Sequence, residues 1–301
     1  MIVHAYAKIN LTLDILGKRQ DGYHDLVMVM QSVGLHDSVS VKLNDDTHIN
    51  LKSSSALLVD NESNTAYKAA KNFFEFSGIS DKGVDIEIEK NIPMEAGMAG
   101  GSADAAAVIV ALNHLCGTNY TDSQLWKIGE KVGADVPFCI TGGTMLAQGK
   151  GEILSQLPQL SDFTYAPVIL LCKPDIGVST GKAYSAVDSC DPSLLKRPDT
   201  ASMRLALSEQ DVSGVASNLG NVFEQVLRIE ECECIKKIML EGGAIGSCMT
   251  GSGTTVFGIF DSETLAKQAA FTLSRSYQST FVTEAVGCGC KIISDKAFSA
   301  E

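Results

Sequence analysis

Basic residues are scarce in this chain of 301 residues. Lysine and arginine total 24 against 36 acidic residues, which gives a formal net charge of −12 and a sequence pI of about 4.9. A surface of this sign repels the phosphate backbone of nucleic acids, so we expect no nucleic-acid partner. A phosphate ligand would need dedicated local groups to bind within this negative overall field.

Long apolar runs and prolines are scarce as well. The chain has 7 prolines, and no window of it approaches the roughly 18 consecutive apolar residues of a membrane span. Residues 1–18 lack a basic leader followed by an apolar core and a small-residue cleavage site. Nine cysteines without such a leader are typical of reduced thiols in a cytosol. We therefore expect a cytoplasmic protein with no membrane partner.

The spacings that bind transition metals are also missing. Cys232 and Cys234 form one cysteine pair, and Cys288 and Cys290 form another. Their one-residue spacers are shorter than those of zinc sites, and no histidine pair follows them. The five histidines show no H-x-x-x-H spacing, so we expect no catalytic transition metal. The favoured interpretation is buried thiols that pack as small apolar side chains.

Hydrophobic periodicity predicts strands followed by helices in the first half of the chain. Hydrophobic residues make up 45% of the sequence and charged residues 20%, as in a folded globular protein. Alternating patterns predict strands at 3–15, 26–33, 39–43 and 84–89. Helical spacing predicts helices at 66–76, 102–115 and 123–131, the second of them apolar nearly all round and therefore buried. Residues 137–148 are expected to form a hairpin that turns at Gly142 and Gly143.

A polar, turn-rich segment at 149–163 is the candidate domain boundary. Beyond it we expect strands at 167–172, 254–260 and 280–286, with helices at 180–187, 212–229, 235–241 and 263–274. This alternation favours an α+β sandwich in which helices cover one face of a mostly antiparallel sheet. The predicted domains are residues 1–155 and 156–301, with the active-site cleft between them.

The most informative stretch is the glycine-rich segment 93–106, PMEAGMAGGSADAA, which follows a predicted strand and opens the buried helix. Glycines let the backbone approach a ligand closely, and a helix N-terminus offers free N–H groups and a positive dipole end. Together they bind phosphate without a basic surface. The alternative is a helix start capped by Ser102, with glycines that serve packing only. The segment matches neither a Walker A loop nor a dinucleotide fingerprint.

This segment resembles the ATP loop of the GHMP small-molecule kinases. Segments 7–11 (AKINL), 19–24 (RQDGYH), 133–138 (GADVPF) and 249–254 (MTGSGT) are also similar to motifs of that family, in order over about residues 8–260. Two positions depart from the common pattern. Ala99 stands where the family often carries glycine, and Ala103 replaces a frequent second serine.

The resemblance implies a two-domain GHMP kinase architecture of the α+β class. The N-terminal domain would resemble ribosomal protein S5 domain 2, and the C-terminal domain would be a ferredoxin-like α/β sandwich. The implied activity is ATP-dependent phosphorylation of the 2-hydroxyl of 4-diphosphocytidyl-2-C-methyl-D-erythritol in the non-mevalonate route to isoprenoid precursors. The alternatives are a kinase of the homoserine or phosphomevalonate type, or a nucleotide-binding relative without catalysis.

The resemblance also implies a catalytic pair. Lys8 and Asp135 match the positions that the family places at the hydroxyl of the phosphoryl acceptor. We expect Asp135 to accept the hydroxyl proton, and Lys8 to orient Asp135 and stabilise the developing charge. The expected ATP-binding residues are those of the loop: Pro93, Met94, Glu95, Ala96, Gly97, Met98, Ala99, Gly100, Gly101, Ser102 and Ala103.

Five residues are candidates for binding the acceptor. Asn10 shares a strand face with Lys8 because it lies two positions further along the strand, and its alternative role is that of a solvated polar residue. Tyr23 offers a ring that can stack on cytosine, and His24 can hydrogen-bond its edge; either could instead pack on the core. Tyr184 could close the other side of the base, and Thr180 is a further candidate contact.

ATP as donor implies Mg²⁺, because the phosphate charge needs neutralisation. The sequence does not identify its protein ligands: Ser102 is the hydroxyl at the start of the helix, and Glu130 fits better as a solvated residue. Residues 251–253 are expected to close the nucleotide cleft as a backbone lip, and their alternative role is a tight connection.

Overall fold

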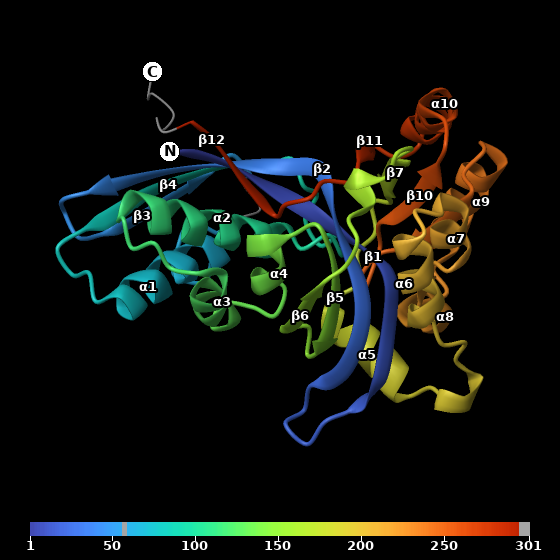
Figure 1. The fold of residues 1–301 in the computed structure, drawn as a ribbon, viewed down its shortest axis with the longest axis horizontal. Coiled ribbons are helices and arrows are strands. Elements are labelled where there is room, and N and C mark those ends of the chain that lie inside the picture. Colours follow the sequence, from blue (N-terminus) through green and yellow to red (C-terminus); the bar gives the residue numbers. More distant parts are fainter. Residues whose placement is uncertain (56–58, 295–301) are drawn as a thin grey trace.

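The computed structural model describes residues 1–55 and 59–294, and its larger sheet has eight strands within that part of the chain (Figure 1). Its main path runs β12–β1–β2–β4–β3, with β5 paired to β2, β6 to β5, and β8 to β1. The strands are β1 (Ile2–Lys18), β2 (His24–Asn44), β3 (Ile49–Ser53), β4 (Gly83–Glu89), β5 (Thr144–Gly149), β6 (Ile153–Gln156), β8 (Gly220–Asn221) and β12 (Cys290–Ser294).

Strand β1 lies near the middle of the molecule. Its first residues alternate between buried and partly exposed, but residues 7–15 are all buried. Burial on both faces arises because this half of the strand has helices on one side and the second half of the chain on the other. The polar side chains that it carries here must therefore find partners inside the protein.

Four helices cover one face of this sheet (Figure 1). They are α1 (Thr65–Ser77), α2 (Gly100–Leu115), α3 (Asp122–Glu130) and α4 (Val136–Thr141). Helix α2 packs against β1, β2, α1 and α4. Its alanines are buried, which confirms the prediction of a central helix whose small side chains permit close packing. Asn64 caps α1 by accepting a hydrogen bond from the Ala66 amide.

The second half of the chain forms a four-stranded antiparallel sheet in the order β11–β7–β10–β9. Its strands are β7 (Val168–Lys173), β9 (Gly246–Met249), β10 (Val256–Phe260) and β11 (Ser279–Glu284). Helices α9 (Glu230–Glu241) and α10 (Glu263–Ser274) pack on it, and the β-α-β-β-α-β order confirms the ferredoxin-like sandwich. The remaining helical segments are η1 (Leu160–Asp162), α5 (Thr180–Asp188), η2 (Pro192–Leu194), α6 (Thr200–Ser208), α7 (Val212–Ser217) and α8 (Val222–Leu227).

The second half of the chain also contributes strands to the larger sheet. After residue 156, the chain contributes β8, parallel to β1, and β12, antiparallel to β1, to the larger sheet. The division at residues 155 and 156 stays a prediction, and it falls within β6. Both halves therefore meet along β1, which carries Lys8.

Several sequence predictions were wrong. Residues 137–148 form helix α4 and then strand β5, because Pro137 at the start of a helix turn favours helix and Gly142, with φ of 67°, ends it. Residues 26–43 form one strand, since β2 pairs with β1 along most of its length. The predicted helix 212–229 is interrupted by β8, and β3, β6, β12 and α6 were not predicted.

The prediction that the paired cysteines are buried was right for only some of them. All nine thiols are free; Cys232 is buried, but Cys234 is exposed and Cys288 and Cys290 are half-buried. Cys232 and Cys234 are separated by two positions on helix α9, so only one can face the core. Within residues 1–55 and 59–294, no helix combines the length and apolarity required to cross a membrane.

Candidate active site

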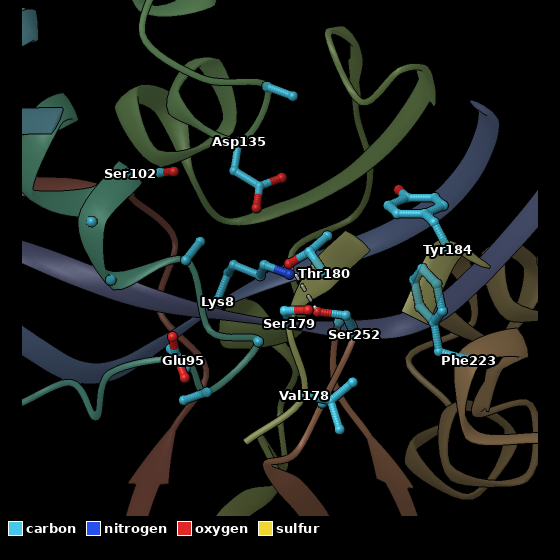
Figure 2. Close-up of a pocket in the computed structure, with 18 of the residues that line it drawn as sticks. Lys8, Glu95, Ser102, Asp135, Val178, Ser179, Thr180, Tyr184, Phe223 and Ser252 are labelled. Atoms are coloured by element: carbon cyan, nitrogen blue, oxygen red, sulfur yellow. Dashed lines mark hydrogen bonds between the residues drawn. The ribbon is translucent and has the colours of Figure 1, made fainter. Parts of the chain in front are cut away.

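A cavity of about 810 Å³ lies between the two halves of the molecule. Both the glycine-rich segment and the start of α5 line it, as do residues 251–253 from the loop between β9 and β10. In Figure 2, Ser102 and Glu95 lie on one side of this space, Lys8 and Asp135 in the middle, and Tyr184 and Phe223 on the other side. One cavity thus connects the N-terminus of α2 with an aromatic region.

The glycine-rich segment leads directly into α2. The helix begins at Gly100, and Ala99 is its N-cap in the left-handed conformation, with φ of 58° and no side-chain cap bond. The structure thus corrects the alternative in which Ser102 caps the helix: Ser102 is the third helical residue and lines the cavity. A left-handed alanine costs about 1–2 kcal/mol, which accounts for the glycine that the motif often carries at this position.

Nine of the eleven expected ATP-binding residues line the cavity. Met98 and Ala103 do not line it, because both side chains are buried in the core. Met98 contributes through its backbone instead, and its carbonyl accepts a 3.2 Å hydrogen bond from the amide of Lys8. The segment therefore fixes the backbone of β1 at the position of Lys8.

Residues 251–253 pack tightly against the glycine-rich segment. A Cβ at Gly97 would lie 2.4 Å from the carbonyl oxygen of Thr250, and a Cβ at Gly251 would lie 2.7 Å from that of Gly97. Both glycines have positive φ, 72° and 58°. Because any side chain would separate the loops, the glycines are needed for contact between the halves. Ser252 also faces Thr180 at 3.3 Å across this edge of the cavity (Figure 2).

Lys8 reaches the cavity from β1, and Asn10 lies behind it. The Lys8 Nζ donates to Asn10 Oδ1 at 2.7 Å, which confirms that the two side chains share one face of the strand. Asn10 Oδ1 also accepts from the Gly251 amide at 3.0 Å and the Thr250 hydroxyl at 3.3 Å. Asn10 is fully buried and does not line the cavity. In this structure Asn10 supports Lys8 and the 251–253 loop, and its role as a substrate ligand stays a prediction.

Asp135 lies across the cavity from Lys8, at the N-cap of α4. Its side chain makes no cap hydrogen bond, lines the cavity and points toward the space above Lys8 (Figure 2). Within the described part of the chain, no ion pair joins Lys8 and Asp135. The structure brings the expected pair to one cavity and leaves the space between the two groups open.

The aromatic region differs from the expected base sandwich. The ring of Tyr184 stacks on His24, with centroids 4.5 Å apart, and meets Phe223 edge-on at 5.0 Å. Tyr184 therefore covers the His24 ring, and both Tyr184 and Tyr23 line the cavity. Tyr23 is 59% exposed, and Lys150 Nζ lies 4.7 Å from its ring centroid. Burial, with a further contribution from the charge of Asp135, raises the pKa of Tyr184 to about 12, so its hydroxyl stays protonated.

Comparisons with known proteins agree with this architecture. Residues 64–143 match the GHMP kinases N terminal domain, and residues 203–279 match the GHMP kinases C terminal domain. A protein of Clostridium acetobutylicum named 4-diphosphocytidyl-2-C-methyl-D-erythritol kinase is 40% identical over 95% of this chain and all of its own length. The chain belongs to the GHMP kinase family.

Other relatives bear the same name or share the fold. A 4-diphosphocytidyl-2-C-methyl-D-erythritol kinase of Acetivibrio thermocellus is 44% identical, over 94% of this chain and 98% of its own. A crystal structure of 4-(cytidine 5'-diphospho)-2C-methyl-D-erythritol kinase superposes with a TM-score of 0.78 at 29% identity, covering 95% of this chain and 100% of the other. A homoserine kinase structure from Cytophaga hutchinsonii, 20% identical with a TM-score of 0.75 and 97% coverage of both chains, shares the GHMP kinase fold.

A buried charge cluster beneath the GHMP loop was missed by the sequence analysis. Lys90 forms ion pairs with Asp37 and, at 2.8 Å, with Asp104 of α2, and both carboxylates are almost fully buried. Burial raises the pKa of Asp104 to about 8 against the opposing effect of Lys90. Burial alone would lower the pKa of Lys90, but the two carboxylates outweigh it and leave that pKa raised. The sequence signal was Asp104 itself, an ionisable residue on an apolar helix.

Two more supporting residues were missed. The side-chain amide of Asn221, on β8, donates to the carbonyls of Met249 and Gly251 at 2.7 and 2.8 Å and so supports the 251–253 loop. Asp188, on α5, accepts from Nε2 of His24 at 2.7 Å and from Lys18 at 2.6 Å. Neither residue carried a motif, because each acts through partners distant in sequence.

Proposed function

We propose that this GHMP kinase transfers the γ-phosphoryl group of ATP to the 2-hydroxyl of 4-diphosphocytidyl-2-C-methyl-D-erythritol (CDP-methylerythritol). One observation carries the proposal: a single cavity holds a helix N-terminus with a glycine-rich approach, a lysine and a carboxylate in its middle, and an aromatic region. The order of these three regions along the cavity fits a triphosphate, a reacting hydroxyl and a pyrimidine base. The names of the relatives support this acceptor. The reaction belongs to the methylerythritol phosphate route to isoprenoid precursors.

The triphosphate binds where the protein offers backbone donors in place of a basic surface. The helical hydrogen bonds of α2 begin at the amide of Ser102, so the amides of Gly100 and Gly101 remain for a phosphate, which the absence of side chains lets approach closely. The helix dipole adds positive potential at this point. These local groups can bind phosphate although the net charge of the protein is −12.

Phosphoryl transfer occurs between Lys8 and Asp135. Asp135 accepts the proton of the acceptor hydroxyl, whose oxygen forms a bond to the γ-phosphorus as the bond to the bridging oxygen of ADP breaks. The Lys8 ammonium, held by Asn10 and 5% exposed, stabilises the negative charge on the transferring group. Because the transition state is loose, positioning of the hydroxyl by Asp135 also contributes to catalysis.

Mg²⁺ accompanies ATP in this proposal and supplies charge neutralisation at the phosphates. The described residues contain no group of three or more His, Cys, Asp or Glu side chains arranged to hold a metal ion. Phosphate oxygens would therefore be its main ligands, and the Ser102 hydroxyl, which lines the cavity at the start of α2, is the protein group that fits beside them. We place the enzyme in the cytoplasm, where its nine free thiols stay reduced.

The acceptor end of the cavity binds the cytidine part of the substrate. Tyr23 presents an exposed ring for stacking, His24 a ring nitrogen, and Thr180 a hydroxyl at the cavity edge. Tyr184 stacks on the His24 ring, and closure of the other side of the base by Tyr184 stays a prediction.

An ADP-release assay with three acceptors tests the proposal. We expect turnover with CDP-methylerythritol and none above background with homoserine or phosphomevalonate. Asp135→Asn preserves the shape of the site and removes the proton acceptor, so kcat should fall by about 100-fold or more with little change in the Kd of ATP. Preferred turnover of homoserine or phosphomevalonate would overturn the acceptor assignment, and normal kcat in Asp135→Asn would overturn the role of Asp135.

A further inference from the structure

Helix α5 holds the ring of His24 by two contacts from one face. Tyr184 stacks on the ring at 4.5 Å, and Asp188 Oδ1 lies 2.7 Å from its Nε2. Tyr184 and Asp188 are four residues apart, so they are neighbours on the helix surface. The stacking therefore fixes the plane of the His24 ring, and the hydrogen bond to Asp188 fixes the direction in which Nε2 points.

The contact with Asp188 decides which ring nitrogen carries hydrogen. An ionised carboxylate only accepts hydrogen bonds, so Nε2 must be the protonated nitrogen. Hydrogen bonds from His24 and Lys18 lower the pKa of Asp188, which keeps the carboxylate ionised. In a neutral imidazole the other nitrogen, Nδ1, then carries a lone pair and accepts hydrogen bonds.

That second nitrogen is left for a ligand. Within the described part of the chain, Nδ1 of His24 has no hydrogen-bond partner, although the side chain is only 7% exposed. His24 lines the cavity beside Tyr23 and Lys150. Nδ1 is not one of the fully buried polar atoms that lack a partner in the described part of the chain, so it is accessible and can accept a hydrogen bond from a ligand.

We propose that Asp188 is a positioning residue that sets the pyrimidine specificity of the kinase: it fixes His24 with hydrogen on Nε2, so that Nδ1 accepts a hydrogen bond from the exocyclic amino group of cytosine. This inference rests on the proposed function. Uracil carries a carbonyl oxygen at the same ring position, which would place two lone pairs against each other. Without Asp188, His24 can move its hydrogen to Nδ1 and donate to that carbonyl.

The test compares CDP-methylerythritol with its uridine analogue, UDP-methylerythritol, in the wild type and in Asp188→Ala. Alanine is a good helix former, so α5 is kept. The wild type should prefer the cytidine compound by about 100-fold in kcat/KM. In Asp188→Ala we expect the preference to fall to about tenfold or less, mainly through a higher KM for CDP-methylerythritol with similar kcat.

A second measurement is independent of turnover. Proton–nitrogen correlation spectra of histidine-labelled protein should show His24 as the Nε2–H form in the wild type and as a mixture of both forms in Asp188→Ala. Lys18→Met is the matched control, because it removes the other partner of Asp188 without touching His24. It should keep both the preference and the single ring form.

The outcomes separate this inference from the proposed function. No turnover of CDP-methylerythritol by the wild type would overturn the proposed function, and this inference with it. Wild-type turnover combined with an unchanged preference or an unchanged ring form in Asp188→Ala would overturn the inference alone. Loss of the preference in Lys18→Met would also overturn it, since the effect would then not depend on the contact with His24.

Discussion

Asn10 is the residue whose replacement tests the site most directly, because its carboxamide oxygen connects the catalytic lysine with a loop of the other half of the molecule. The oxygen accepts from Lys8 Nζ, the Gly251 amide and the Thr250 hydroxyl, at 2.7, 3.0 and 3.3 Å. Asn10→Ala removes this acceptor. Gly251 and Thr250 are buried, so water does not easily replace it.

The expected cost follows from the two buried donors that lose their acceptor. Each such donor costs about 1–3 kcal/mol, so we expect the free energy of unfolding to fall by about 3 kcal/mol in Asn10→Ala. Lys8 also loses the group that directs its ammonium into the cavity. A misdirected stabilising charge lowers kcat by about 100-fold, and a loosened 251–253 loop raises the KM for ATP. Urea unfolding and steady-state kinetics measure these effects.

Asn10→Asp is the comparison variant that retains the acceptor oxygen. Its carboxylate keeps an oxygen in the accepting position, and the loss of the amide nitrogen affects only a 3.5 Å contact with the sulfur of Met28. Its carboxyl group is fully buried beside Lys8, so we expect stability to fall at pH values where the group is ionised and to recover as pH is lowered, while the retained oxygen keeps the KM for ATP closer to the wild-type value than Asn10→Ala does. Equal stability and an equal KM for ATP in Asn10→Ala and the wild type would refute the reasoning, because the buried donors would then not depend on this oxygen.

Two further predictions concern the phosphate loop and the charge cluster beneath it. Gly97→Ala places a Cβ 2.4 Å from the carbonyl oxygen of Thr250, so the KM for ATP should rise at least about tenfold. The control is Gly117→Ala, because Gly117 has a similar φ of 63° but no atom within 4 Å, so this variant should affect only stability. An equal KM for ATP in both variants would contradict the prediction. Burial raises the pKa of Asp104 from 3.8 to about 8. Between these pH values the folded state retains a proton that the unfolded chain has released, so the free energy of unfolding falls as pH rises through this range. Asp104→Asn cannot ionise and should flatten that slope in unfolding curves measured from pH 5 to 8; an unchanged slope would show that another group titrates.

The sequence was most informative where local pattern and function coincide. The small residues of α2 predicted a buried helix, and the two-position spacing predicted a shared face for Lys8 and Asn10. The close approach of the glycine-rich segment to a ligand stays a prediction. Each of these predictions depends on residues that lie within a few positions of one another in the sequence. The sequence prediction failed for α4, where Gly142 and Gly143 resembled a hairpin turn, but Pro137 lies in the first turn of a helix.

The sequence by itself identified groups that line the cavity: the glycine-rich approach to α2, the lysine on β1, Asp135, and the aromatic residues His24 and Tyr184. Only the tertiary structure decided how these groups support one another. Lys90 pairs with Asp37, 53 positions away, and Asn10 bonds to Gly251, 241 positions away. Such contacts leave no periodic trace, because a buried polar group needs a partner but local sequence does not specify which distant residue supplies it.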